Sequence, residues 1–166
     1  APDGSAIAFT AGVEAQLNVR PLAQPEPTPL DGIAGVRGPF FSPDGKWIAY
    51  FQVGDLKKVA VTGGAPVTIR AGCAAGNRGG NWGDDDTIVF AAAGGSEGLR
   101  RVRAFGGDPV VITQIDSTKG ETAHMWPELL PGGQAILFTV IAGGLDNATV
   151  VAQDLRSGAR SVVARG

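Results

Sequence analysis

Three groups of residues in this 166-residue chain have residue types and spacings that could support catalysis, metal binding or anion binding. The first group contains a serine. Residues 94–98, Gly-Gly-Ser-Glu-Gly, match the Gly-x-Ser-x-Gly pattern of serine hydrolases. That pattern needs a strand, a sharp turn and a helix, so that the serine lies exposed beside a histidine. Here the motif lies between two strand-like runs, 88–92 and 99–104, far from the sole histidine, His124. We therefore interpret it as a hairpin loop and expect no catalytic residue.

The second group is acidic. Asp84, Asp85 and Asp86 offer the carboxylate oxygens that Ca²⁺ prefers. A similar segment earlier in the chain has Asp44 at the same place in a turn, so a charged, solvated turn explains the run without a metal. Cys73 has no histidine near it in the sequence, and we interpret it as a small buried residue rather than a nucleophile. We expect no metal and no cofactor.

The third group is cationic and aromatic: Arg37, Arg78, Asn77, His124 and Trp126. Arginines with nearby amide, imidazole and indole groups can receive an anion or an acidic peptide segment. Hydrogen bonding between neighbouring structural units is the competing interpretation of these residues. General acid–base catalysis by the histidine would need a positioned partner, and none is evident in the sequence. These five residues can act together only if the elements before them are arranged side by side.

The chain has the periodicity that such an arrangement needs, because one turn motif recurs about every 40 residues. Its clearest copy is Ser-Pro-Asp-Gly-Lys-Trp-Ile-Ala-Tyr at residues 42–50. The other copies lie at residues 1–9, 83–90 and 131–138. When the segments before these turns are aligned, Arg37 falls on Arg78, and Trp126 falls on Gly79. The third group therefore occupies equivalent positions, at the entry to successive strands.

Each repeat contains four short strand-like segments and no helical period with caps. Alternating apolar and polar residues follow the turn in runs 16–22, 56–61, 99–104 and 148–153. Further strands are expected at 67–69, 110–112 and 161–163, and at 38–41, 80–82 and 127–130 before the turns. The glycine pairs 63–64 and 106–107 supply the positive φ that tight hairpins need.

These patterns predict an all-β fold, a β-propeller of about four four-stranded antiparallel blades. The expected blades are approximately 1–35, 36–76, 77–122 and 123–166, within a single partial propeller. The first blade lacks its innermost strand. On this interpretation the third group lies at the mouth of the central channel.

Composition narrows the classes of function. Lys and Arg total 14 and Asp and Glu total 16, a net charge of −2, so we expect no nucleic-acid partner. No run approaches the roughly 18–20 apolar residues of a membrane span, so we expect no membrane insertion. A hydrophobic content of 43%, in short regular runs, indicates a folded chain despite 26 glycines. One cysteine permits no intramolecular disulfide and leaves the compartment open.

Residues 41–50, the paired-glycine hairpins and the closing strands resemble the TolB-like, WD-type β-propeller repeat over essentially the whole chain. The resemblance implies a bacterial propeller, usually of six or more blades, that acts as a platform for binding proteins or ligands. It favours a periplasmic or other extracytoplasmic location. Related propellers also accompany hydrolase domains of the prolyl oligopeptidase family.

A narrower resemblance covers residues 121–133. They look like the variant repeat of propeller regions attached to bacterial serine/threonine protein kinases, in which a Glu, a Ser-His pair and a Trp-Pro precede a Leu-Pro-Asp-Gly turn. This chain has Ala123 in place of the serine and Gly132 in place of the aspartate. The chain itself has no kinase signature, neither a phosphate-binding glycine loop before a helix nor a His-Arg-Asp loop.

The function expected from all of this is a non-enzymatic propeller scaffold that binds a protein or small ligand. The scaffold is expected to be part of a larger propeller, or a homo-oligomer that completes a ring. An alternative is the accessory or sensor propeller of a kinase or a prolyl-oligopeptidase-type enzyme. A third possibility is a repeat fragment whose only property is self-assembly. Propeller specificity lies in the loops, so the sequence names no ligand.

Overall fold

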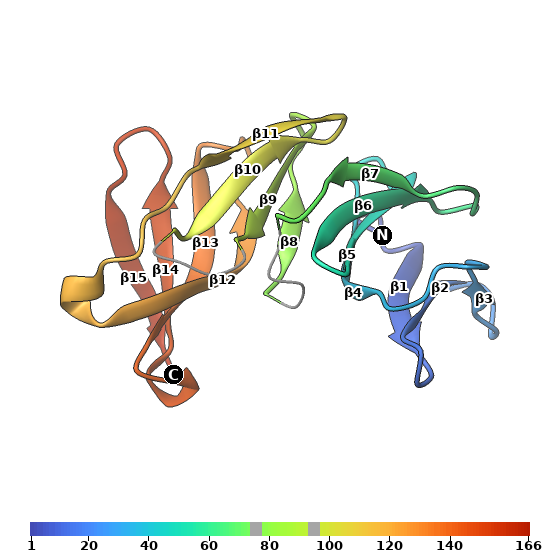
Figure 1. Cartoon of the computed structure of the whole chain (residues 1–166), viewed down its shortest axis with the longest axis horizontal. Helices are drawn as coiled ribbons and strands as arrows, with labels where there is room; N and C mark the ends of the chain where they lie inside the picture. Colours follow the sequence, from blue (N-terminus) through green and yellow to red (C-terminus); the bar gives the residue numbers. More distant parts are fainter. Residues whose placement is uncertain (74–77, 93–96) are drawn as a thin grey trace. The chain divides into compact units, whose positions relative to one another are not determined.

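The computed structural model describes residues 1–73, 78–92 and 97–166, and within these residues the chain is all-β. Four antiparallel meander sheets follow one another along this part of the chain, with two short 3₁₀ helices, η1 (Ser117–Lys119) and η2 (Leu145–Asn147) (Figure 1). The chain divides into two compact units, Ala1–Asn77 and Arg78–Gly166, and each unit contains two of the sheets. The predicted fold class, with its three-stranded first sheet, is confirmed.

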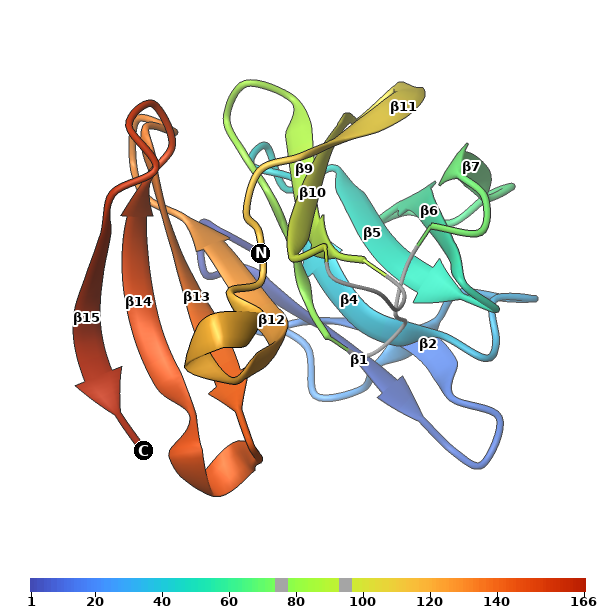
Figure 2. The same ribbon diagram turned by 60° about the vertical axis from the view of Figure 1, so that its left-hand side comes forward.

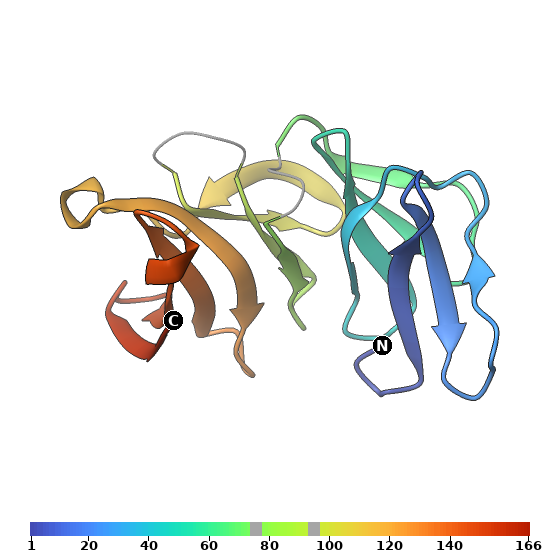
Figure 3. The same ribbon diagram turned by 90° about the horizontal axis from the view of Figure 1, so that it is seen from below.

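The first unit contains a three-stranded and a four-stranded sheet, counted over its described residues. The strands of the first sheet are β1 (Ala6–Ala11), β2 (Gln16–Pro21) and β3 (Thr28–Pro29). Those of the second are β4 (Arg37–Phe41), β5 (Trp47–Gln52), β6 (Asp55–Ala60) and β7 (Val67–Arg70). Every neighbouring pair is antiparallel and consecutive in sequence, as in a meander. Figure 3 shows β1 and β2, in dark blue, side by side.

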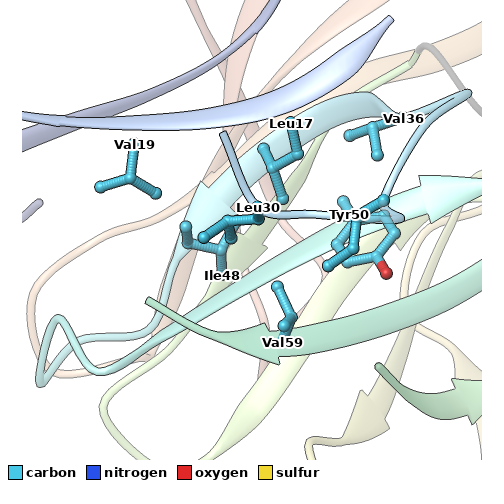
Figure 4. Packing of buried hydrophobic residues seen from close by; sticks show 8 residues of the cluster. Leu17, Val19, Leu30, Val36, Ile48, Tyr50 and Val59 are labelled. Atoms are coloured by element: carbon cyan, nitrogen blue, oxygen red, sulfur yellow. The ribbon is translucent and has the colours of Figure 1, made fainter. Parts of the chain in front are cut away.

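The core of the first unit lies between its two sheets. Leu17 and Val19 of β2 pack with Ile48 and Tyr50 of β5, and Leu30 closes the cluster from the connecting loop (Figure 4). All five side chains are buried. Alternate residues, Leu17 and Val19 of β2 and Ile48 and Tyr50 of β5, therefore bury one face of each sheet against the other, which is how a short meander becomes stable.

The second unit contains two four-stranded sheets within residues 78–92 and 97–166. The strands of the first are β8 (Gly80–Trp82), β9 (Thr87–Ala91), β10 (Leu99–Arg103) and β11 (Gly106–Val111). Those of the second are β12 (Glu121–Leu129), β13 (Ala135–Ala142), β14 (Thr149–Asp154) and β15 (Arg160–Arg165), side by side in sequence order (Figure 2). Its core joins Val89 and Leu99 of the first sheet to Ile136, Phe138 and Val151 of the second.

The recurring turn is stabilised by hydrogen bonds to its aspartate side chain. Asp44 Oδ1 accepts from the Lys46 backbone N–H at 3.0 Å and from the Ser42 hydroxyl at 2.6 Å. Asp3 and Asp85 make the same kind of bond, to the N–H groups of Ser5 and Thr87. An aspartate that accepts from the backbone two residues on is an Asx turn, and it explains why aspartate recurs at this place.

Two local features differ in detail from the predicted strands. The paired glycines do have positive φ, at 88° and 113° for Gly63 and Gly64 and at 109° and 116° for Gly106 and Gly107. Gly106 and Gly107, however, begin β11, so the reversal occurs just before them. The strand expected at 127–130 is longer, since β12 begins at Glu121. The additional residues of β12 hold the features described next.

Candidate functional site

Trp126 is an exposed aromatic side chain on a strained backbone. It lies in β12, where the pairing with β13 shifts register between Met125 and Glu128. Its φ is 51°, a value that is a genuine outlier for a bulky residue. Its side chain is nevertheless 50% exposed, so burial does not explain the strain. Strain of this kind concentrates at sites of function.

The neighbouring β8 segment holds Trp126 in place. The Trp126 backbone N–H donates to the Arg78 carbonyl oxygen at 2.7 Å. A Cβ at Gly79 would lie 3.0 Å from both Cα and Cδ1 of Trp126, and Gly79 itself has a φ of 82°. Position 79 therefore requires glycine for two reasons, the positive φ and the close approach of Trp126. The result is an indole ring that is half exposed to solvent, on a backbone that is held against the β8 segment.

A side-chain amide joins β8 to β12 just beyond the tryptophan. Asn81 Nδ2 donates to Glu128 Oε2 at 3.0 Å, and Asn81 Oδ1 accepts from the Leu129 backbone N–H at 3.1 Å. The Asn81 side chain thus donates one hydrogen bond to the adjacent sheet and accepts another from it. Together with the bond from Trp126 to Arg78, it fixes the start of β8 against the bulge in β12.

His124 lies on the same strand but is buried, with 2% exposure. Its Nδ1 is 2.8 Å from Thr113 Oγ1, and its Nε2 is 3.0 Å from Glu121 Oε2. The Thr113 oxygen already accepts from the Leu99 backbone N–H at 2.7 Å, so its own hydrogen is free to be donated to Nδ1. This assigns the neutral tautomer that carries its hydrogen on Nε2 and donates it to Glu121.

Glu121 is the centre of this buried network. It pairs with Arg160, whose Nη1 lies 3.2 Å from Oε1, and it accepts from the Asp116 backbone N–H at 2.8 Å. Burial raises the pKa of Glu121, but the hydrogen bonds from Asp116 and His124 more than offset this, so its pKa is lowered overall. Burial lowers the pKa of His124. The site therefore holds a carboxylate, a guanidinium and a neutral imidazole.

The order hydroxyl, imidazole and carboxylate is that of a catalytic triad, but the arrangement is structural. Thr113 and His124 are both buried, and the Thr113 oxygen is occupied by a backbone N–H, so no substrate reaches it as a nucleophile. The sequence showed no partner for His124, and the structure provides two. Glu121 lies three residues away on the same strand, whereas Thr113 lies beyond η1, and only the fold brings it close.

The cationic residues of the predicted mouth have different surroundings. Arg37 is the first residue of β4 in the first unit and is exposed. Arg78 is half-buried at the start of the second unit, where its carbonyl holds Trp126. Asn77 lies outside the described residues. The structure thus brings together Arg78 and Trp126, while His124 points into the interior of the same unit.

Among the described residues, the other candidates from the sequence form no catalytic or metal-binding arrangement. Ser96 lies outside them. Asp85 accepts from Thr87 and Asp86 from the Trp82 indole N–H, at 3.3 Å, so both serve the turn. In the described part of the chain, no three His, Cys, Asp or Glu residues are grouped as metal ligands. Burial raises the pKa of the Cys73 thiol, which keeps it protonated.

Over the same residues, the structure contains no helix with the length and apolar character to cross a membrane.

Comparison with known proteins identifies the fold. No protein-family model and no curated protein sequence matches the chain. Among solved structures, TolB from Acinetobacter baumannii is 20% identical with a TM-score of 0.80, over 99% of this chain and 42% of that one. A protein of Agrobacterium tumefaciens assigned as TolB is 21% identical with a TM-score of 0.79, over 97% and 61%. A chain of a nidogen–laminin complex is 15% identical with a TM-score of 0.73, over 96% and 60%.

These likenesses show a TolB-type β-propeller fold. The chain spans less than two thirds of the length of each of these three structures. Two enzymes share the fold more distantly, a prolyl endopeptidase with a TM-score of 0.61 and an oligogalacturonate lyase with one of 0.53. The same architecture thus occurs in proteins of different activity, and function has to be argued from the site.

Proposed function

We propose that this chain is a non-enzymatic propeller scaffold that binds a protein or ligand through the surface of Trp126 and Arg78. The observation that carries the proposal is Trp126 itself, an exposed indole ring held in a left-handed backbone conformation against Gly79. A residue whose backbone is already held in place loses less entropy on binding than one on a loose segment, and tryptophan is enriched at interface hot spots.

The ligand class follows from the charge of Arg78, whose backbone carbonyl bonds to Trp126. Arg78 can pair with a carboxylate, and an indole face offers apolar contact to a side chain of the same ligand. An acidic peptide segment satisfies both groups. No reaction is part of the proposal, because the histidine that could catalyse one is buried and fully bonded.

A peptide-display selection against the immobilised 166-residue chain tests this function, with the recovered peptides titrated by fluorescence anisotropy. Trp126→Ala should weaken their binding about thirtyfold, since hot-spot truncations cost about 2 kcal/mol or more. Phe105→Ala is the matched control, because Phe105 is also an exposed aromatic residue of the second unit. Equal binding by the wild type and Trp126→Ala contradicts the role of the ring. Unchanged binding by an Arg78→Ala variant contradicts the acidic ligand.

The scaffold is proposed to act within a larger ring, either as part of a longer propeller or by association of copies. Two facts support this. The first sheet has three strands where the other sheets of the described chain have four, and the chain spans only part of its TolB-type neighbours. Sedimentation across a concentration series tests it. A discrete oligomer, or monomers that expose apolar surface to a dye, is expected, and a monomer without dye binding contradicts it.

A second candidate is the accessory or sensor propeller of a kinase or of a prolyl-oligopeptidase-type enzyme. Its support is the sequence of residues 121–133 and the fold shared with a prolyl endopeptidase, of which this chain covers 28%. The extracytoplasmic location expected from the TolB resemblance suits either candidate. The complete reading frame decides between them, since an adjoining catalytic region is required by the second and not by the first.

A further inference from the structure

The chain contains three aspartate–glycine pairs, at residues 3–4, 31–32 and 44–45. At such a pair the glycine nitrogen can attack the carboxyl carbon of the aspartate side chain, because glycine has no side chain to shield its nitrogen. An N–C bond forms, and the amide hydrogen and a carboxyl hydroxyl leave as water. Hydrolysis of the resulting imide at its other carbonyl leaves isoaspartate, in which the main chain runs through the side-chain carbon. Water is lost and then regained, so the reaction needs no other reactant.

Two of the pairs lie in the recurring turn, which opposes this reaction. Asp44 Oδ1 accepts from the Ser42 hydroxyl at 2.6 Å and from the Lys46 N–H at 3.0 Å, and these bonds lower the pKa of Asp44. An ionised carboxylate is a poor electrophile, because its oxygen must gain protons before it can leave as water. The Gly45 N–H donates to the Ser42 carbonyl at 2.9 Å, so the nucleophile is held as well. Equivalent bonds hold the pair at residues 3–4.

Asp31 and Gly32 lie in a turn that holds neither reacting group. The Ile33 N–H donates to the Leu30 carbonyl at 3.2 Å, so Asp31 and Gly32 are the two central residues of a β-turn. Both are exposed, and Gly32 has a φ of 73°, which glycine adopts without strain. Among the described residues, neither the Asp31 carboxylate nor the Gly32 N–H has a hydrogen-bond partner. The electrophile and the nucleophile are therefore both free at this pair.

The same turn connects two residues of the core of the first unit. Leu30 and Ile33 are buried in one cluster with Leu17. The Leu17 N–H donates to the Ile33 carbonyl at 2.9 Å, and the Leu17 carbonyl accepts from the Leu30 N–H at 2.9 Å. Isomerisation inserts one more carbon into the main chain between these two anchors. At least one of the two hydrogen bonds, or the packing of one side chain, must then change.

We infer that Asp31 is the site at which this chain converts spontaneously to L-isoaspartate, and that the change loosens the core of the first unit. The reaction places a new α-carboxylate on the exposed turn and leaves the mass unchanged. The inference depends on contacts within the first unit alone and is independent of the Trp126 surface.

Incubation of the 166-residue chain at neutral pH and physiological temperature tests the inference. Digestion followed by electron-transfer mass spectrometry distinguishes isoaspartate from aspartate at each position. Isoaspartate should form at residue 31, and about tenfold or more slowly at residue 44, whose turn must open locally before it reacts. Transfer of a labelled methyl group from S-adenosylmethionine by an L-isoaspartate O-methyltransferase measures the same product independently. The isomerised fraction should unfold at a lower urea concentration than the intact chain.

Two synthetic peptides show whether the fold causes the difference. Residues 28–36 and 41–49 contain the two pairs without their turns, so the peptides should isomerise at similar rates. In the whole chain, Asp31→Glu should abolish methyl incorporation, because glutamate would have to form a larger ring that closes more slowly. Asp44→Glu is the matched control and should leave incorporation at residue 31 unchanged.

The peptides also define the results that overturn the inference. One is an intact Asp31 in the folded chain after the peptide of residues 28–36 has isomerised. Another is isoaspartate at Asp3 or Asp44 that forms as fast as at Asp31. A third is an isomerised fraction with the same urea midpoint as the intact chain, because the turn would then have no effect on the core.

Discussion

Gly98 gives the most direct test of the buried network around His124. A Cβ at this position would lie well inside 3.0 Å of His124 Nδ1 and Thr113 Oγ1, and 2.9 Å from the Thr113 carbonyl oxygen. Real Cβ atoms do not approach other atoms so closely, and none of the three is the end of a flexible side chain. Gly98→Ala must therefore displace either β10, which starts at Leu99, or the Thr113–His124 pair.

The size of the effect follows from what is displaced. Overpacking of a filled interior costs about 1–3 kcal/mol. A buried polar group that loses its partner costs about 1–3 kcal/mol more. The bonds from Leu99 to Thr113 and from Thr113 to His124 are both strained by the new methyl group. We therefore expect Gly98→Ala to lower the free energy of unfolding by about 4 kcal/mol, a large part of the roughly 5–15 kcal/mol of a typical domain.

Urea unfolding followed by circular dichroism measures this loss. Gly12→Ala is the control, since a Cβ there meets no atom within 4 Å and its φ of 74° makes the strain purely local, about 1–2 kcal/mol. A Gly98→Ala, His124→Ala double variant should cost less than the two single variants together, because the second change removes part of the clash. If Gly98→Ala lowers stability by no more than Gly12→Ala does, the geometry assigned to Thr113 and His124 is wrong.

Three further predictions concern single residues. Burial lowers the pKa of His124, so below pH 6.5 the unfolded state binds more protons than the folded state, and the free energy of unfolding should fall as the pH drops. In urea titrations at several pH values, His124→Gln should flatten this dependence. An unchanged slope would contradict the assignment of a buried, neutral His124. Val53 is 97% exposed, has a φ of 51° and precedes Gly54 in a two-residue hairpin turn, for which Asn-Gly is the favoured pair. Val53→Asn should therefore raise the free energy of unfolding by about 0.5–1 kcal/mol. A lower melting temperature would refute this. The buried Tyr50 hydroxyl has no hydrogen-bond partner among the described residues, so Tyr50→Phe should leave thermal stability equal or higher, and a loss above about 1 kcal/mol would show a partner there.

The turns and strands could be predicted from the sequence because their causes are local. Asp44 bonds to the N–H two residues on, and Gly63 and Gly64 have the positive φ for which glycine is suited. Such features depend on a few consecutive residues, and their recurrence about every 40 residues was enough to predict meander sheets.

The candidate site was decided by tertiary structure. Trp126 could be aligned with Gly79, but its bulge and its bond to Arg78 depend on how β12 packs against β8. His124 has a polar side chain that the sequence placed at a channel mouth, yet Thr113 and Glu121 bind it in the interior. Repeat periodicity states which residues are equivalent along the chain. Which way a side chain turns, and what satisfies its polar atoms, depends on contacts between sheets that no local pattern encodes.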